Sequence, residues 1–476
     1  MTQNLASDVR KPGTYHTFDD TSGARGLVPL NRAIACIGTL GSSGAMSAGV
    51  PTQVFNEADC DTQAGASTIL SLMGKKVFAQ ARKLGVQPPK VFLVGVADPA
   101  GTAAIYKLTC AGTATEGKDV VFSVCGRIFR ASVANGDDQD AVATAIAAAL
   151  NARIKEIPFA AAVNGVGPEI VDLTATCTGV NSNGYTPTVI SAPAGITVTP
   201  SAPTPGVGVI DDTAALDALL AAHYFSVAVE NSTSVSRDDL EAHMDDAWAA
   251  GAKKYRHAFL CDRGNASSST TLAAGANRKE VVIVGAENFQ DIAGECAVAV
   301  GTARLSQERP SYNYDGTQLA LVGPLLDSDV YIDTEAETLL AGGVTPLVRT
   351  DDGVEIMRLV TTKTTDSGAA FENLLDLSNS WTVAYYALQL DPRLKRALKG
   401  KNVDEDLLRQ LEDIGYAVLK AGETLGDLHK VDDHKDEIVA ASHSTVPSRI
   451  LYDFPQSVVP NAHQVDATHR LFVEGA

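Results

Sequence analysis

The residues of this sequence that most suggest chemistry form a glycine-rich segment, Gly38-Thr-Leu-Gly41-Ser-Ser-Gly44, which follows an apolar run. Backbone amides of a glycine-rich turn after a strand can bind a phosphate group. The spacing is not the G-x-G-x-x-G of a dinucleotide site, and no Lys-Ser or Lys-Thr pair follows as in a P-loop. Gly74-Lys75-Lys76 lacks the upstream glycine as well as the hydroxyl residue. The sequence therefore favours a flexible surface loop over a nucleotide site.

Other groups of reactive side chains have spacings that fit no standard site. The motifs G-x-S-x-G and H-E-x-x-H are absent, as are paired C-x-x-C motifs. A polar, loop-like stretch holds the closest metal-like cluster: His429, Asp432, Asp433, His434 and His443. One helical segment carries an acidic run: Asp238, Asp239, Glu241, Asp245 and Asp246. We interpret both as solvated surface and give the same interpretation to His463 and His469. The sequence thus predicts no catalytic site, no metal site and no cofactor.

The seven cysteines are scattered along the chain, and several lie inside apolar runs. An odd number without paired spacing is not a disulfide framework. We expect reduced, buried thiols and folding in a cytoplasmic environment.

Composition and charge narrow the class of protein further. The chain has 476 residues, which at about 100–200 residues per domain predicts two to four domains. It carries 38 Lys+Arg against 57 Asp+Glu, a net charge of −19, which disfavours direct binding of nucleic acid. Residues 209–390 hold 12 basic and 27 acidic residues, either as a solvated surface or as a face that meets or avoids a charged partner. The polar first residues indicate no signal peptide, and no apolar run is long enough to insert into a membrane.

Residues 31–100 and 209–305 alternate between short apolar runs and amphipathic segments. The runs predict strands at Arg32–Gly38, Val91–Ala97, Phe225–Glu230, Ala258–Asp262 and Val281–Ala286. The segments between them predict helices at Gln63–Lys83, Asp212–Ala222, Arg237–Ala250 and Gly294–Leu305. Strands that are apolar on both faces and separated by helices are typical of a mostly parallel sheet covered on both sides. We predict one α/β domain.

Residues 103–208 differ in character, being poor in charge and rich in Thr, Ala, Val and Gly. Alternating segments there predict strands at Ile105–Ala111, Asp119–Val124 and Glu169–Thr176, and Asp138–Ile157 predicts one helix. The Pro/Gly-rich run 200–208 predicts an exit linker. The sequence therefore predicts a β-rich module inserted into a crossover connection.

The last part of the chain begins with an apolar helix, Leu374–Leu390, predicted to end at Asp391-Pro392. A second helix is predicted to begin with Asn402 as its cap, and strand-like pieces follow at Ser448–Phe454 and Thr468–Val473. Strand-like residues also lie near the N-terminus, at Pro12–Phe18. A lone strand at a chain end pairs either with an edge of its own sheet or with another chain.

Three stretches resemble the contractile tail sheath proteins of Mu-like and related myophages. The first is Pro12-Gly13-x-Tyr15 followed by Arg32-Ala-x-Ala-x-Ile-Gly38, and the second is Arg309-Pro310-Ser-Tyr312-Asn-Tyr314-Asp315-Gly316. The third runs from Glu335 through Gly342-Gly343 and Pro346 to Gly353, Arg358 and Thr361-Thr362, and on to Thr364-Thr365-Asp366 and Leu374-Leu375-Asp376. Together they span roughly residues 10–390. From the residues alone, the third stretch predicts a loop at 342–346 and then a hairpin, Leu347–Thr350 with Val354–Thr361, turning at Asp351-Asp352-Gly353.

The resemblance implies a fold and a division of the chain. The fold is α/β, with a mostly parallel sheet core, an inserted β-rich (α+β) domain, and a C-terminal α+β sheath domain with extended terminal arms. The implied division is an N-terminal linking arm 1–22, a sheath core 23–102 with 209–385, an inserted outer domain 103–208, and a C-terminal domain with its arm 386–476.

The resemblance also implies a structural role and its partners. Sheath subunits form stacked hexameric rings around a tail tube and contract to drive the tube through the host envelope, without enzymatic activity. The implied partners are further copies of the chain, the tail tube protein, and the baseplate and tail terminator proteins. The implied location is the virion tail, assembled in the host cytoplasm. Strand exchange between subunits is expected at Gly13, Tyr15, Thr17, Phe18, Leu471, Phe472 and Val473.

Alternatives remain at the level of sequence. A tailocin or injection-system sheath would have the same pattern. An α/β enzyme that uses the 38–44 loop, and a surface adhesin that binds through residues 103–208, are alternatives from other classes.

Overall fold

The structure is a computed structural model that describes residues 32–307, 309–326, 329–446 and 448–463. The described chain forms two compact units. The sheet unit comprises residues up to Ser380 together with 461–463, and the C-terminal unit comprises Trp381–Pro460. No described helix is long and apolar enough to cross a membrane.

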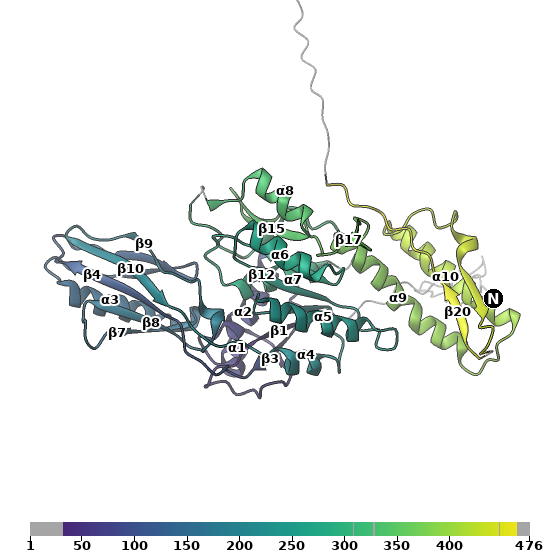
Figure 1. Ribbon diagram of the computed structural model, residues 1–476, viewed down its shortest axis with the longest axis horizontal. Helices are drawn as coiled ribbons and strands as arrows, with labels where there is room; N and C mark the ends of the chain where they lie inside the picture. The colour runs from purple at the N-terminus through teal and green to yellow at the C-terminus, as the bar shows by residue number, and fades with distance from the viewer. Residues whose placement is uncertain (1–31, 308, 327–328, 447, 464–476) are drawn as a thin grey trace, which may run out of the picture. The chain divides into compact units, whose positions relative to one another are not determined.

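A nine-stranded mixed sheet forms the centre of the sheet unit (Figure 1). Across the sheet the order is β14 (Thr317–Leu319), β16 (Gly353–Ile356), β15 (Val344–Thr350), β13 (Val281–Gly285), β12 (His257–Asp262), β11 (Ser226–Val229), β1 (Ala33–Thr39), β3 (Lys90–Val96) and β2 (Thr52–Val54). The six strands from β15 to β3 are parallel, whereas β2, β16 and β14 add antiparallel edges. Every residue of β1, β11 and β13 is buried, as expected for strands covered on both faces.

Helices cover both faces of this sheet. One face is covered by α2 (Ile69–Lys83) and α7 (Ala293–Ser306), with α1 (Glu57–Ala64) packed on α2. The other face is covered by α4 (Thr213–Leu219), α5 (Ser234–Trp248), α6 (Ala266–Ala276) and α8 (Asp333–Ala341). A large sheet in an α/β arrangement is as predicted, and the five predicted core strands are present. Helices α6 and α8 were not predicted, because α6 consists mainly of Ala, Ser and Thr and α8 is short and rich in acidic residues and Thr, so neither has a clear apolar stripe.

The helix predicted over residues 63–83 is two helices. The chain turns between α1 and α2, where Gly65 has a φ of 89° and Ser67 a φ of 66°. The Thr68 side chain then accepts from the Ser71 amide and begins α2. Two left-handed residues followed by a new cap interrupt the helix in spite of its continuous apolar pattern.

The third resembling stretch contains the predicted hairpin, but its second strand is Gly353–Ile356 instead of the predicted Val354–Thr361, and Pro346 is placed differently. β15 and β16 pair up to Thr350↔Gly353, which confirms the turn. Pro346, expected in the preceding loop, lies inside β15 opposite Gly285, the last residue of β13. Proline is tolerated at this position because β13 ends there, and the Pro346 carbonyl still accepts from the Met357 amide at 3.2 Å.

The inserted module lies between β3 and α4 and has two small sheets. One has the order β10 (Ile196–Thr204), β4 (Ile105–Gly112), β8 (Ile170–Ala175) and β7 (Phe159–Val163), and the other β6 (Arg127–Ala131), β5 (Val120–Val124) and β9 (Thr188–Ser191). Helix α3 (Gln139–Ala152) packs on strands of both sheets, with Asp138 as its cap, and the short helix η1 (Ile154–Glu156) follows. A second short helix, η2 (Val180–Ser182), follows β8.

The expected exit linker at 200–208 is largely a strand. β10 continues to Thr204 and Pro200 lies opposite Leu108 of β4. Because β10 is an edge strand, its prolines interrupt no ladder on the outer side. Thr102 and Val207 then exchange two backbone hydrogen bonds of 2.9 and 3.0 Å, so the chain enters and leaves the module side by side.

The C-terminal unit contains most of α9 (Leu377–Leu398), then α10 (Glu405–Leu425), the short helix η4 (Lys435–Glu437) and a hairpin of β19 (Val439–Ser442) and β20 (Ile450–Asp453). The predicted end of the first helix at Asp391-Pro392 is wrong, because α9 continues through Pro392. The last turns of α9 contribute Leu394 and Ala397 to a cluster with α10 and the hairpin, and this packing offsets the hydrogen bond that proline cannot make.

The start of the second helix also differs from the prediction. Asp404, not Asn402, is its cap, and an Asp404 side-chain oxygen accepts from the Leu407 amide at 2.8 Å. Asp and Asn are equally good caps, so the residue types alone did not decide between these positions.

Arg256 is a fully buried cation that holds the turn after α4. Its guanidinium donates to the carbonyls of Leu219 at 3.1 Å and Ala222 at 2.9 Å, which are orphan acceptors at the end of α4. Burial lowers the pKa of Arg256 to about 10. Burial together with Arg256 lowers the pKa of His243 to about 3, so the neutral His243 ring is the partner of the guanidinium at 3.2 Å.

Replacing Arg256 by methionine should destabilise the sheet unit by about 2–4 kcal/mol, because the Leu219 and Ala222 carbonyls lose a charged donor and a buried side chain is replaced. Arg256→Lys should lose less, since an ammonium group can reach one of the carbonyls but not both. Urea denaturation followed by circular dichroism measures the difference. Equal stability of the methionine variant and the native chain would show that Arg256 does not stabilise the turn after α4.

Candidate functional site

The residues predicted to exchange strands between subunits lie outside the described residues. These are Gly13, Tyr15, Thr17, Phe18, Leu471, Phe472 and Val473. Their role in strand exchange therefore stays a prediction.

The glycine-rich segment is a packed turn, not a flexible surface loop. A Cβ at Gly38 would lie 2.3 Å from Oε2 of Glu230, and one at Gly44 would lie 2.7 Å from the carbonyl oxygen of Gln63. The Gly41 amide donates to the Ala64 carbonyl at 2.9 Å. The glycines are required for this close approach to the end of α1.

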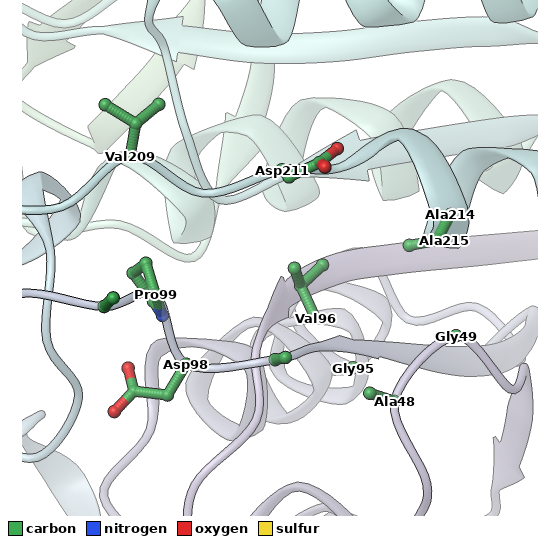
Figure 2. Close-up of a pocket in the computed structure, with 12 residues that line it drawn as sticks. Ala48, Gly49, Gly95, Val96, Asp98, Pro99, Val209, Asp211, Ala214 and Ala215 are labelled. Carbon is green, nitrogen blue, oxygen red and sulfur yellow. The ribbon is translucent and has the colours of Figure 1, made fainter.

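A pocket of about 530 Å³ lies at the carboxyl end of β3, where the inserted module begins (Figure 2). Its described lining is mostly small and apolar, with the carboxylates of Asp98 and Asp211 and no cationic side chain. Asp98 accepts from the amide and the hydroxyl of Thr178, both at 2.9 Å. The negative charge of the two carboxylates disfavours a phosphate ligand in this pocket.

A second pocket, of about 570 Å³, lies at the carboxyl ends of β11 and β12 and is partly lined by the inserted module. The Glu230 carboxylate accepts from the Thr39 amide at 2.6 Å and from Nδ2 of Asn181 at 2.8 Å. Burial raises the pKa of Glu230 to about 7 in spite of these hydrogen bonds. Because Asn181 belongs to the module and Thr39 ends β1, Glu230 connects the module to the sheet.

A buried cluster of charges connects the same two parts more strongly. Glu295, in the first turn of α7, is 1% exposed and accepts two hydrogen bonds from the Arg127 guanidinium at the start of β6. Lys76 of α2 lies 3.6 Å from Glu295 and 3.7 Å from Asp291. Asp291 in turn accepts from the amides of Val322 and Gly323 at 2.8 and 2.9 Å. We call Arg127, Glu295, Lys76 and Asp291 the junction cluster.

Electrostatics within the junction cluster favour the ionised carboxylate. Burial alone would raise the pKa of Glu295, and the adjacent Arg127 and Lys76 more than reverse this, so that its pKa is lowered. The stabilisation from Glu295 is therefore present above the pKa of an ordinary carboxyl group and is lost as pH falls through the lowered value. At neutral pH the junction cluster therefore makes its full contribution to the stability of the folded chain.

Further contacts extend the junction between module and sheet. Arg263 donates to the carbonyls of Gly184 and Phe289, at 3.0 and 2.5 Å, and its guanidinium lies 4.5 Å from the ring centroid of Tyr185. The Tyr185 hydroxyl accepts from the Ala293 amide, next to Glu295. The module is thus joined to the sheet by buried polar contacts as well as by its two connecting segments.

The hairpin of the C-terminal unit presents an exposed face and an unpaired edge. Tyr452 packs against α10 and donates to the Leu411 carbonyl at 3.0 Å. On the opposite face, the side chains of Val439 and Leu451 are 45% and 47% exposed. Among the described residues, β19 and β20 pair only with each other.

The acidic run predicted from the sequence makes contacts with the rest of the fold. Asp238 and Asp245 of the acidic run are largely exposed, as predicted, and Asp245 accepts two hydrogen bonds from Arg278 of 2.6 and 2.7 Å. In the described part of the chain, no group of three or more His, Cys, Asp or Glu side chains is placed to hold a metal ion. All seven cysteines are buried and free, as predicted.

Sequence reasoning missed the junction cluster. Arg127 and Glu295 lie 168 positions apart, and neither belongs to a recognisable motif. The one local signal is the turn Cys125-Gly126, where both residues have positive φ and direct the chain into β6.

Comparisons with known proteins give similarities to tail sheath proteins. No family model matches the chain. A curated relative, the Mu-like prophage FluMu tail sheath protein of Haemophilus influenzae, is 28% identical over 180 residues, which are 38% of this chain. The match spans 35% of that relative's length.

Solved structures of sheath proteins share the fold. The sheath tail protein of Desulfitobacterium hafniense superposes with a TM-score of 0.51 at 11% identity, over 94% of this chain and 100% of that chain. The sheath of an extracellular contractile injection system in its contracted state gives 0.52 at 9% identity, over 99% of both chains. The sheath tail protein of Listeria innocua gives 0.50 at 12% identity, over 91% and 96%. The resemblance to contractile tail sheath proteins that the sequence indicated is confirmed, and the fold is theirs.

Removing the cation from the junction cluster should loosen the inserted module. Arg127→Met leaves a buried carboxylate with only Lys76 nearby, which should reduce the free energy of unfolding by about 2–4 kcal/mol. Hydrogen exchange should rise in the contacting segments of the module. The double variant Arg127→Met/Glu295→Gln should recover part of the loss.

The matched control is Arg82→Met, which breaks the exposed pair of Arg82 with Glu57 and should change stability by less than about 1 kcal/mol. Similar losses in the two single variants would contradict a special role for the junction cluster.

Proposed function

We propose that this chain is a structural subunit of a contractile tail sheath that polymerises as stacked hexameric rings around a tail tube. Contraction then drives the tube through a host envelope. The observation that carries the proposal is the agreement of fold with solved sheath proteins along nearly the whole chain, together with the sequence match to a prophage sheath protein. The source of energy is the difference between two packings of the same chains, so no nucleotide is required.

Under this proposal the role of the chain is structural. The glycine-rich turn is filled by protein contacts, and the pocket at the end of β3 has no cationic side chain in its described lining. Partners under this proposal are further copies of the chain, a tail tube protein, and baseplate and terminator proteins. The location is the tail of a virion or of a related contractile particle, assembled in the host cytoplasm.

Neighbouring subunits of a contracting assembly must stay connected while their body contacts are remade. Strand exchange meets this requirement because an added strand is held by several main-chain hydrogen bonds, each worth about 1 kcal/mol net. The hairpin of β19 and β20 supports this mode, since a two-stranded sheet is marginal alone and gains stability from further strands. We propose that it accepts a strand from another copy, and that residues 13–18 and 471–473 supply such strands.

Electron microscopy of the purified protein at increasing concentration tests the proposed function. Striated hollow tubes or stacked rings are the expected result. Protein that stays monomeric both alone and with a preformed tail tube would contradict the proposal.

Deletion of residues 1–20 should give a folded chain that cannot polymerise, because the proposed donated strand is removed. Sedimentation and electron microscopy measure assembly, and the far-ultraviolet circular dichroism spectrum should be unchanged. Deletion of residues 1–9 is the control, since it keeps 13–18 and should still polymerise. Tubes formed by the longer deletion would refute the role of this segment.

Leu451→Asp should reduce polymerisation at least tenfold without unfolding the monomer. It places a charge on the exposed face of the hairpin, which another copy would cover. Ile128→Asp, at a side chain of similar exposure (51%) on the inserted module, is the matched control and should assemble normally. Equal effects of the two variants would contradict a specific role of the hairpin in assembly.

A further inference from the structure

The residues that return from the C-terminal unit are held against the sheet unit by a small polar cluster. Nδ2 of Asn461 donates to the Ser378 hydroxyl at 2.7 Å, and the Ala462 carbonyl accepts from Nδ2 of Asn313 at 3.3 Å. His463 follows and places its ring between two carboxylates. This cluster lies just before residues 464–476, which contain the predicted C-terminal strand.

Both nitrogens of the His463 ring face an acceptor. Nδ1 lies 2.6 Å from Oδ2 of Asp315, and Nε2 lies 3.0 Å from Oδ2 of Asp376. A neutral imidazole carries one N–H donor, whereas an imidazolium carries two. Two hydrogen bonds to two ionised carboxylates therefore require the protonated ring.

The surrounding charges fit a cation at this position. Arg358 donates from Nε to the other oxygen of Asp376 at 2.9 Å, so Asp376 lies between two cations. The Asp315 carboxylate also accepts from Nδ2 of Asn313 at 3.2 Å. In the described part of the chain, the charged groups facing the ring are Asp315 and Asp376, with Arg358 behind the latter. Loss of the proton leaves two carboxylates with one cation.

We propose that protonated His463 is a pH-dependent bridge that holds residues 461–463 on the sheet unit, and that deprotonation weakens this attachment. The inference concerns this chain alone and does not depend on the proposed function. It assigns His463 a role that the sequence did not indicate, where the residue was interpreted as solvated surface.

The direction of the pH dependence follows from linkage. Burial by itself would lower the pKa of His463, but the hydrogen bonds and charges of Asp315 and Asp376 outweigh burial and raise the pKa. A group whose pKa is raised on folding contributes stability that is fully present below its unfolded value, about 6.5, and is lost as pH rises through the folded value. The bridge is therefore strongest in mildly acidic solution.

The test compares the melting temperatures of the native chain and His463→Gln between pH 6 and pH 9. The difference should be largest at pH 6 and shrink towards zero at pH 9. Asn461→Ala is the matched control, since it removes a contact of the same segment without removing a titrating group, and its difference should stay constant. A His463→Gln difference that does not change with pH would overturn the proposal.

A second measurement starts from the native chain, for which no variant has to fold. In protein labelled with ¹³C at histidine, the ring signal of His463 should titrate above pH 6.5 in the native chain. Asp315→Asn should shift that titration downwards, because one carboxylate partner is neutralised. A native titration at or below 6.5 would refute the bridge.

Discussion

Burial of the Glu295 carboxylate at the start of α7 is the constraint on which the arrangement of the sheet unit depends. An ionised carboxylate with 1% exposure is stable only when cations and donors surround it. Here one cation comes from α2 and the other from the inserted module. The same charge thus positions α7 on the sheet, α2 beside α7, and the module on both. A displacement of any of these parts would leave a buried charge without its partner.

The sheet was predictable from sequence because its strands are buried on both faces, which leaves a local signal of short apolar runs. The junction cluster was not, since the partners of Glu295 are far apart in the chain and every member is a common surface residue type. A prediction from local sequence was wrong at Pro392, where the helix was expected to end. Packing of Leu394 and Ala397 keeps the helix intact there. The histidine at 463 likewise gives no pattern, because Asp315 and Asp376 belong to two distant segments.

Two features of the described chain suit the proposed function. The sheet unit pairs its strands in a nine-stranded sheet and attaches its insert through buried charges. The C-terminal unit ends in a two-stranded hairpin with exposed apolar side chains, which is a surface suited to a further strand. In a contractile assembly, the first property would conserve the subunit's internal structure and the second would conserve its connections.

The histidine bridge adds a constraint on how these parts are connected. The chain leaves the sheet unit after Ser380 and returns at Asn461, whose side chain contacts Ser378. Within the sheet unit, the outgoing residues Asp376 and Ser378 thus contact the returning residues His463 and Asn461. Loss of the proton on His463 weakens this contact, because a neutral ring has one N–H donor for two carboxylates.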